Sequence, residues 1–442
     1  MKKVHFIGIG GAGTSAAAAL AKEHGFEVDG CDIDSKSAYL PELEKLNINV
    51  EAGHDTSHIE GQDIIVTSAA VGTFDPLNLE IAEAKKIGKE VITTEKFVSD
   101  YLAKDKFIIA VSGTHGKSTT TAMVGRILED AGYDPTVYVG AIVTKWGKNY
   151  RYGKGKYFVL EADEYQDKFL TYKPNIGVIN NIEYDHPDYF KNEDQLVESF
   201  VNFVRNFQPE SKLILGTDPE EDKNIEKLVG SIGNVASVIK DHLSLRDFNF
   251  QLQISGKHNQ LNAISAYLCA EEVGVDEAVI KASLSGFSGT ARRFEFNEEV
   301  NGVKIFDDYA HHPSEVSATI EAAREKFPNE RIWCIFQPHT FSRTKVLFDD
   351  FVKSFSASNV DKLIFVDIYA SREKNTPDIS SLDIAKKVKD SVYIGSLEEA
   401  ASYVAKNVST GDVVIAMGAG DIYKFSTILA SKLKGQNGRR AS

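Results

Sequence analysis

The segment from Ser112 to Thr121 carries the clearest chemical pattern in this sequence. It contains two glycines and Lys117, which is followed by four consecutive hydroxyl side chains. An apolar run at 107–111 precedes it and a helical pattern follows, which predicts a strand, a loop and a helix start in that order. Glycines in such a loop let backbone N–H groups approach phosphate oxygens, and the helix N-terminus favours negative charge. Lys117 adds a mobile cation and Ser118 a hydroxyl ligand for magnesium, so the segment predicts a nucleoside triphosphate site.

The loop differs at one position from the usual phosphate-loop pattern, which places a glycine six residues before the lysine. That position is Val111 here, so the loop is a compact variant. The alternative interpretation is a tight strand-to-helix turn, but Gly-Lys-Ser followed by further hydroxyls is unusual for a plain turn. The residues expected to contact the nucleotide here are Gly113, Thr114, His115, Gly116, Lys117, Ser118 and Thr119.

A second glycine-rich loop lies near the N-terminus, at 8–13. It follows a predicted strand at 4–7 and opens an alanine-rich helix, as in dinucleotide-binding folds. The next predicted strand ends at Asp32, where a ribose-binding carboxylate would lie. The pattern alone does not separate NAD from a UDP-sugar, because both present a diphosphate to the helix, and a glycine turn needed only for packing is a further alternative.

Acidic and imidazole side chains follow two predicted strands of the central region. Glu161 and its neighbours to Glu164 come directly after the strand at 157–160, and His186 follows the strand at 176–179 with Asn181 and Asp185. Carboxyl ends of parallel strands face the ligand crevice in α/β sheets. With Ser118, one carboxylate and one imidazole would hold Mg²⁺ beside the nucleotide. A solvated acidic loop with a hydrogen-bonded histidine is the alternative.

Cationic side chains concentrate in the C-terminal third. Arg292 and Arg293 suit the charge of a γ-phosphate, although a surface salt bridge would also explain them. His339 and Arg343 are four residues apart and share one helical face. An arginine near a helix N-terminus opposes the dipole, so a bound carboxylate explains Arg343 better than stability does, with a solvated pair as the alternative. The segment 307–313 clusters ionisable groups after a strand, where His-His could also cap the next helix.

Composition limits the classes of function. A chain of 442 residues with 42% hydrophobic and 26% charged residues predicts two to four globular domains. The net charge of −14 argues against a nucleic-acid or membrane-surface partner, and no apolar run reaches membrane-spanning length. The separated Cys31, Cys269 and Cys334 indicate reduced, buried thiols, so we expect a cytoplasmic protein.

Alternating strand and helix patterns predict an α/β fold with parallel sheets. The polar stretch at 104–106 and the glycine-rich stretch at 285–290 mark the expected boundaries. We therefore expect three domains: 1–104 with a Rossmann-like fold, 105–288 with the phosphate loop, and 289–442 with a second Rossmann-like fold.

These motifs resemble the Mur ligase family in order and spacing over essentially the whole chain. The matching segments are Gly8–Gly13, Gly113–Lys117, Glu161–Glu164, Asn181–His186, Gly256–Asn259, Asn262, Arg292–Arg293, Asp307–Pro313 and Met417–Asp421. The resemblance implies one domain for a UDP-sugar, one for ATP and one for an incoming amino acid. It also implies ATP and Mg²⁺ as cofactors, UDP-N-acetylmuramate and L-alanine as substrates, and a monomer or homodimer.

The resemblance assigns roles to individual residues. Those implied to be catalytic are Lys117, Glu161, His186 and Arg293, and those implied to serve magnesium are Ser118, Glu161 and His186. Asn259 and Asn262 would lie near the adenine, and Arg293 near the γ-phosphate. The implied substrate contacts are Gly10, Gly11, Asp32, His54 and Ser68 for the UDP end, and Tyr309, His339 and Arg343 for the amino acid.

The resemblance thus predicts an ATP-dependent carboxylate–amine ligase that acts through an acyl phosphate in peptidoglycan precursor synthesis. Three alternatives remain open at this point. A related ligase would attach a murein tripeptide to the same UDP-sugar. The N-terminal glycines alone would also allow a nicotinamide-dependent oxidoreductase, and the fold would allow a catalytically silent UDP-sugar sensor.

Overall fold

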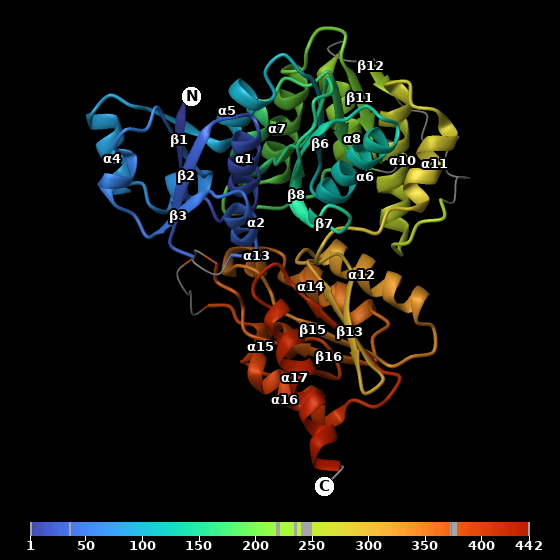
Figure 1. Cartoon of the computed structure of the whole chain (residues 1–442). Helices are drawn as coiled ribbons and strands as arrows, with labels where there is room; N and C mark the ends of the chain where they lie inside the picture. The colour runs from blue at the N-terminus through green and yellow to red at the C-terminus, as the bar shows by residue number, and fades with distance from the viewer. Residues whose placement is uncertain are drawn as a thin grey trace. The chain divides into compact units, whose positions relative to one another are not determined.

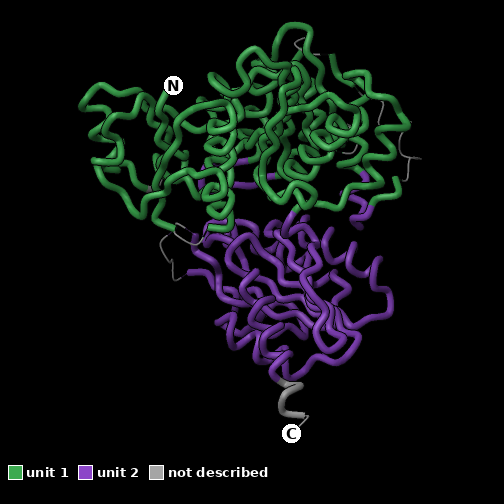
Figure 2. The backbone as a smooth tube through the Cα atoms, viewed as in Figure 1, with its two compact units in different colours: residues 1–183, 193–252, 261–290 green, residues 184–192, 253–260, 291–442 purple. Residues whose placement is uncertain are grey.

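The computed structural model describes residues 2–34, 37–217, 222–233, 237–239, 250–371, 373 and 378–440. Within them the chain forms three largely parallel sheets, each packed with helices, which is the α/β fold that the sequence predicted (Figure 1). Contacts divide the chain into two compact units, coloured separately in Figure 2. The first unit is 1–183, 193–252 and 261–290, and the second is 184–192, 253–260 and 291–442. The domain boundaries after 104 and 288 stay a prediction.

The first unit opens with a five-stranded parallel sheet of order β3-β2-β1-β4-β5. Its strands are β1 (Lys3–Ile7), β2 (Glu27–Asp32), β3 (Asn49–Ala52), β4 (Ile64–Thr67) and β5 (Glu90–Thr93). Its helices are α1 (Ala12–Glu23), α2 (Leu40–Lys45), η1 (Thr56–Ile59), α3 (Ala69–Phe74), α4 (Leu79–Lys86), α5 (Thr94–Phe97) and η2 (Val98–Leu102). Because the chain crosses from β3 back to β4 beside β1, the carboxyl end of β1 is a topological switch point, where such sheets bind ligands.

The same unit contains a seven-stranded sheet of order β12-β11-β10-β6-β9-β7-β8, in which only β7 and β8 pair antiparallel. Its strands are β6 (Phe107–Ser112), β7 (Thr136–Val143), β8 (Lys148–Arg151), β9 (Tyr157–Glu161), β10 (Ile176–Ile179), β11 (Lys212–Leu215) and β12 (Ser237–Ile239). The helices here are α6 (Lys117–Asp130), η3 (Tyr165–Thr171), α7 (Glu193–Arg205), α8 (Lys223–Ile232), α10 (Lys257–Glu272) and α11 (Glu277–Ser285). The central strand β6 is almost wholly buried, which explains its continuous apolar run.

The two sheets of the first unit are linked through α1 and the hairpin of β7 and β8. Asn149 Nδ2 donates to Ala12 O at 2.6 Å, and Tyr150 Oη donates to Glu42 Oε1 at 3.2 Å. A Cβ added at Gly13 would lie 2.6 Å from Tyr138 Oη. The last glycine of the N-terminal loop therefore permits close packing of α1 against β7, which is one of the uses of that position in this loop type.

The second unit is built on a six-stranded sheet of order β13-β14-β18-β15-β16-β17, with β13 antiparallel. Its strands are β13 (Glu295–Val300), β14 (Val303–Asp308), β15 (Ile332–Phe336), β16 (Lys362–Phe365), β17 (Ser391–Tyr393) and β18 (Val413–Met417). Its helices are α12 (Pro313–Lys326), α13 (Phe341–Val346), α14 (Phe348–Ala357), α15 (Ser381–Ala385), α16 (Leu397–Asn407) and α17 (Tyr423–Arg440).

Side chains along the strands of this sheet point alternately to its two faces, so the hydrophobic core has two layers, one on each face. Phe336 of β15 packs with Phe351 and Phe355 of α14 in one layer. Trp333 of the same strand packs in the other layer, which includes Phe425 of α17. Successive side chains of a strand point to opposite faces, so apolar residues at every position of β15 supply both layers. The sheet is covered on both sides, as expected for parallel strands.

Among the described helices, none combines the length and the apolar composition that a membrane crossing requires.

Candidate active site

The phosphate loop joins β6 to α6, and its shape requires glycine at two positions. Gly113 and Gly116 have φ of +123° and +79°. A Cβ at Gly116 would lie 2.2 Å from Asn262 Oδ1, and one at Gly113 would lie 2.9 Å from the backbone nitrogen of Asn180. Both the left-handed backbone and the close neighbours therefore exclude a side chain, and the loop backbone forms a cradle of the kind that phosphates occupy.

Residues 180–183 brace this loop from the next strand of the sheet. Asn181 Oδ1 accepts a hydrogen bond from His115 N at 2.9 Å, and Asn180 Nδ2 donates to His115 O at 3.2 Å. Thr114 Oγ1 donates to Glu183 O at 2.9 Å. Because β10 pairs directly with β6, the segment after β10 lies beside the loop after β6. The sequence analysis had placed Asn181 after the strand at 176–179 without a role of its own, and in the structure its side chain supports the phosphate loop.

Lys117 lies at the first turn of α6 with its ammonium folded back over the loop. Its Nζ donates to Gly113 O at 2.7 Å and to Thr114 O at 3.1 Å. It also contacts both carboxylate oxygens of Glu164, at 3.0 and 2.8 Å. Only 1% of the Glu164 side chain is exposed. The structure thus pairs Lys117 with Glu164, a contact that the sequence analysis did not address; the magnesium role expected for Glu161 stays a prediction.

The Lys117–Glu164 pair is strongly perturbed. Burial lowers the pKa of the Lys117 ammonium, but the Glu164 carboxylate outweighs this effect and holds the pKa above its ordinary value. Burial raises the pKa of Glu164 to about 7, although Lys117 opposes the rise. The lysine therefore stays charged at neutral pH, and its partner is a carboxyl that gains a proton readily when the ammonium moves away.

Glu161 and Ser118 lie at the same edge of the central sheet. Glu161 ends β9 and pairs in register with Val111, next to the start of the loop. Its Oε2 accepts from Gly140 N at 2.7 Å. Ser118 and Thr119 are buried in the first turn of α6. The first unit alone therefore brings a carboxylate and a hydroxyl to the ends of adjacent strands, while His186 belongs to the second unit.

Asn259 and Asn262, both on α10, are three residues apart and buried. Asn259 Nδ2 donates to Ser255 O at 2.7 Å. The close approach of Asn262 to Gly116 connects the helix to the phosphate loop. Their contact with adenine stays a prediction.

Four residues predicted from the N-terminal fold lie near the switch point of the first sheet. Asp32 Oδ2, at the end of β2, accepts from Gly10 N at 2.7 Å. Ser68 follows β4 and caps α3 by accepting from Val71 N at 3.3 Å. Gly11 precedes α1 as its N-cap residue. The structure brings these residues to the carboxyl ends of β1, β2 and β4, as a nucleotide site of this fold requires.

His54, also predicted for the UDP end, has other partners. Its Nδ1 lies 3.3 Å from Cys31 Sγ and 3.1 Å from Glu80 Oε2. These contacts direct its ring nitrogen toward a buried side-chain cluster. The role of His54 at a UDP-sugar stays a prediction.

In the second unit, Arg343 forms a buried pair with Asp185. Arg343 Nε donates to Asp185 Oδ1 at 2.7 Å and Nη2 donates to Oδ2 at 3.2 Å, and only 6% of each side chain is exposed. Burial raises the pKa of Asp185, but the guanidinium outweighs burial and holds the pKa well below its usual range. The sequence predicted a carboxylate on Arg343, and in the structure the side chain of Asp185 supplies one.

His339 lies beside this pair and its protonation follows from its neighbour. Arg343 Nη1 lies 3.1 Å from His339 Nδ1, and because a guanidinium only donates, Nδ1 accepts and Nε2 carries the proton. Burial lowers the pKa of His339 well below its usual range, and His311 and Arg343 lower it further. Arg343 and the Nε2–H of His339 are thus two neighbouring donors, a combination suited to a carboxylate.

Tyr309 and His311 complete this group. His311 Nδ1 lies 2.9 Å from Tyr309 O, so the ring donates there and its Nε2 has a lone pair. The guanidinium carbons of Arg292 and Arg293 lie 4.9 and 5.1 Å from the centre of the Tyr309 ring. The second unit therefore brings all three residues predicted for the amino acid, namely Tyr309, His339 and Arg343, into one region around His311.

The pH dependence of stability should report on His311. Burial lowers the pKa of His311 from 6.5 to about 4, with Glu315 opposing and Arg343 reinforcing the shift. Between these pH values the unfolded chain binds more protons at this residue than the folded chain, so its contribution to stability is complete above pH 6.5 and is lost as the pH falls to about 4. His311→Asn keeps a donor for Tyr309 O and should reduce the loss of unfolding free energy over this window by up to about 3 kcal/mol.

Denaturant unfolding of both proteins at several pH values checks this expectation. His339 also titrates with a lowered pKa, so some dependence should remain in the variant. The two proteins are compared at pH 8, where neither histidine titrates, to remove any constant difference. Parallel stability curves from pH 8 to pH 4 would contradict the assignment.

The two arginines at the start of the second unit have different environments. Arg292 Nη2 donates to Gly418 O at 2.7 Å and Gly420 O at 3.0 Å, so it anchors the loop after β18. Arg293 Nη1 lies 3.5 Å from Glu315 Oε1, and 31% of its side chain is exposed. His312 caps α12, as the sequence allowed. Arg292 thus has a structural role in the loop after β18, and the contact of Arg293 with a γ-phosphate stays a prediction.

Comparisons with known proteins cover the three parts of the chain separately. Residues 3–106 match the Mur ligase family catalytic domain, residues 111–270 the Mur ligase middle domain, and residues 292–420 the Mur ligase glutamate ligase domain. Two relatives are UDP-N-acetylmuramate–L-alanine ligases. The one from Caldicellulosiruptor bescii is 38% identical over 98% of this chain and 99% of that protein. The one from Caldanaerobacter subterraneus is 40% identical over 96% of both chains.

Solved structures show the same arrangement of elements. The UDP-N-acetylmuramate–alanine ligase of Thermotoga maritima superposes with a TM-score of 0.81 at 27% identity, over 99% of this chain and 100% of that chain. A murein peptide ligase of Psychrobacter arcticus gives a TM-score of 0.74 at 23% identity, over 98% of this chain and 99% of that chain. The second likeness is low in identity and concerns the fold alone.

Proposed function

This chain belongs to the Mur ligase family, and on that premise we propose that it joins L-alanine to the carboxylate of UDP-N-acetylmuramate with conversion of ATP to ADP and phosphate. The product is a precursor of peptidoglycan. The observation that carries the proposal is the phosphate loop with Lys117 held over it, within a chain that matches alanine-adding relatives over nearly its full length.

The chemistry explains why cations gather in a protein of net charge −14. A carboxylate is a poor acyl donor because its oxygen is a poor leaving group. Transfer of the γ-phosphoryl group to that oxygen forms an acyl phosphate and releases ADP. The amine of alanine then attacks the carbonyl carbon, the C–O bond to phosphate breaks, and the amine loses a proton. Two anions must meet in the first step, so fixed cations lower its barrier.

Most of the residues that serve ATP in this proposal belong to the first unit. Lys117 exchanges its contacts with Glu164 for the β- and γ-phosphates, while the backbone from Gly113 to Thr119 cradles them. Asn259 and Asn262 lie near the adenine, and Arg293 approaches the γ-phosphate. Magnesium would neutralise phosphate charge, and the Ser118 hydroxyl and the Glu161 carboxylate fit its preference for oxygen ligands. His186 completes the proposed ligand set.

The remaining residues bind the other two substrates. Gly10, Gly11, Asp32 and Ser68 are proposed to hold the UDP end at the switch point of the first sheet. His54 is proposed to contribute to the same UDP end. Tyr309, His339 and Arg343 are proposed to bind alanine. For Arg343 this means that the alanine carboxylate competes with, or adds to, the carboxylate of Asp185. We further propose a cytoplasmic location and a monomer or homodimer.

An acceptor panel tests the proposal. The protein is incubated with UDP-N-acetylmuramate and Mg-ATP plus L-alanine, glycine, L-serine or the murein tripeptide, and phosphate release and product mass are measured. We expect release that depends on both UDP-N-acetylmuramate and alanine, with one alanine added per product. Turnover with the tripeptide and none with alanine would assign the chain to murein-peptide ligation instead. Absence of turnover with every acceptor would leave the sensor alternative.

A further inference from the structure

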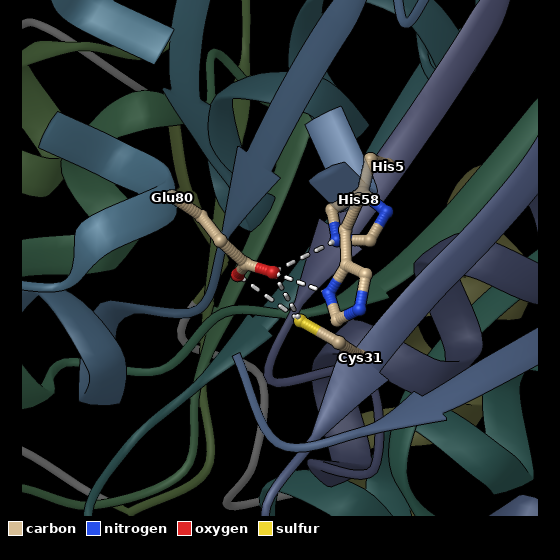
Figure 3. Close-up of side chains that lie close together, drawn as sticks. All are labelled: His5, Cys31, His58 and Glu80. Atoms are coloured by element: carbon tan, nitrogen blue, oxygen red, sulfur yellow. Dashed lines mark hydrogen bonds and ion pairs between the residues drawn. The ribbon is translucent and has the colours of Figure 1, made fainter. Parts of the chain in front are cut away.

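A second group of reactive side chains lies inside the N-terminal sheet domain, apart from the phosphate loop. It consists of His5 on β1, Cys31 on β2, His58 on η1 and Glu80 on α4. Each offers one ligand atom, and these four atoms lie within 4.8 Å of one another. Figure 3 shows the rings of His5 and His58 and the sulfur of Cys31 gathered around the carboxylate of Glu80, each joined to it by a dashed line. We call these four residues the Cys31 cluster.

The distances in the Cys31 cluster resemble those around a small tetrahedral ion. His58 Nδ1 lies 2.6 Å, Cys31 Sγ 3.2 Å and His5 Nε2 3.9 Å from the nearest oxygens of Glu80. In a zinc site, bonds of about 2.0–2.3 Å place neighbouring ligand atoms about 3.3–3.7 Å apart. The three separations from Glu80 lie on both sides of these values, and all four ligand atoms lie within 4.8 Å of one another.

His5 is oriented as a metal ligand usually is. Its Nδ1 lies 2.6 Å from Asp29 Oδ1, and because a carboxylate accepts, Nδ1 carries the proton and Nε2 has a lone pair. Gln62 Nε2 in turn donates to Asp29 Oδ2 at 2.7 Å. Within the described part of the chain, Nε2 of His5 has no hydrogen-bond partner, although the residue is only 1% exposed. A carboxylate that holds the far side of a ligating imidazole is a recurring feature of zinc sites.

Glu80 needs a positive partner, and the cluster supplies none that is permanent. Its side chain is fully buried, and among the described residues its ion pairs are with His5, His54 and His58 only. A buried carboxylate is costly without a compensating charge. The Cys31 thiol is also held in its neutral form, because burial raises its pKa and the Glu80 carboxylate raises it further. A dication would balance both Glu80 and a Cys31 thiolate, which leaves the buried group neutral overall.

We propose that His5 Nε2, Cys31 Sγ, His58 Nδ1 and a carboxylate oxygen of Glu80 bind one Zn²⁺ ion. A thiolate with two imidazoles selects zinc over magnesium or calcium, which prefer oxygen ligands. Binding transfers the thiol proton to solvent, so affinity rises with pH. It also moves the His58 proton from Nδ1, which donates to Glu80 in the structure, to Nε2, so that Nδ1 gains the lone pair a ligand needs. Four protein ligands make a closed, structural site that ties β1, β2, η1 and α4 together. Cys31 directly precedes Asp32, so the ion would also steady the residue that holds Gly10.

Metal content and a cobalt spectrum test this proposal independently of ligase activity. The full chain is dialysed against a chelator, re-equilibrated with Zn²⁺ at pH 7.5, desalted and measured by mass spectrometry of the metal. We expect about one zinc per chain, as in structural sites of this ligand set. Replacement by Co²⁺ should give the near-ultraviolet band of a cobalt–thiolate bond and the visible bands of a tetrahedral ion.

Matched variants separate the cluster from adventitious binding. Cys31→Ser should remove the cobalt–thiolate band and weaken Zn²⁺ binding at least about 100-fold, whereas Cys334→Ser, which removes a buried thiol of the second unit, should change neither. Asp29→Asn alters the support of His5 without removing a proposed ligand and should weaken binding about 10- to 100-fold. Substoichiometric zinc in the unmodified protein, or a cobalt band that survives Cys31→Ser, would overturn the proposal. So would equal losses in Cys31→Ser and Cys334→Ser.

Discussion

Replacing Lys117 with methionine should lower kcat/KM for ATP by about 1,000-fold or more, because the variant loses the one cation that the structure places on the phosphate loop among the residues it describes. The fold should survive. Glu164 would lose its partner, but burial already raises its pKa to about 7, so the carboxyl can take up a proton and stay neutral. We therefore expect a loss of only about 1–3 kcal/mol in unfolding free energy.

Two further variants isolate the role of the Lys117 charge. Lys106→Met removes a lysine that precedes β6, at the end of that strand far from the phosphate loop, where its Nζ donates to Gly155 O at 2.7 Å, and should leave kcat/KM within a few fold. The double variant Lys117→Met with Glu164→Gln removes the unpaired carboxyl and should restore stability without restoring turnover. Steady-state phosphate release and urea unfolding provide both readouts. Turnover within tenfold of the unmodified protein in Lys117→Met would contradict the assignment.

Replacing Arg343 with methionine should reduce both stability and alanine turnover. The substitution leaves Asp185 buried without its bidentate partner, and breaking a buried pair in this way costs about 3–5 kcal/mol. As a comparison, Lys227→Met breaks a pair at 2.8 Å with Asp194 in which both side chains are at least half exposed, so it should cost less than about 1 kcal/mol. Urea unfolding of the two variants measures the difference.

The double variant Arg343→Met with Asp185→Leu distinguishes a structural pair from a substrate contact. With both charges removed, most of the lost stability should return, because two apolar side chains replace a buried pair at little cost. If Arg343 also binds the alanine carboxylate, alanine turnover should remain at least about 100-fold below that of the unmodified protein, with the KM for alanine raised most. Recovery of both stability and turnover would show that Arg343 only holds Asp185.

Long apolar runs made the central strands predictable. The strands expected at 107–111, 157–160 and 176–179 correspond to β6, β9 and β10, which are buried on both faces. The strands that the sequence did not reveal include β3, β8, β12, β13 and β17, all at sheet edges. Edge strands are half exposed and include polar residues, so their pattern does not differ from that of a loop. The internal strands β7 and β11 were also missed.

Sequence spacing could not predict which of two nearby carboxylates faces the lysine. Glu161 and Glu164 follow the same strand, three residues apart. The turn after β9 directs Glu164 toward Lys117, while Glu161 bonds the backbone of Gly140 on a neighbouring strand. That choice is made where the chain leaves β9, before η3 begins at Tyr165, and residue types alone do not specify it.

The sequence alone determined the family, the α/β class and the phosphate loop of this protein, because each depends on local order: glycines at fixed offsets, a lysine at the helix start, and apolar runs of strand length. Only the tertiary structure decided the partners of the charged groups. These partners are distant in sequence or cannot be told apart by spacing. Examples are the pair of Arg343 with Asp185, the pair of Lys117 with Glu164, and the Cys31 cluster. Electrostatic pairing acts over a few ångströms in space, so strand order and helix packing, not sequence separation, determine which charges meet.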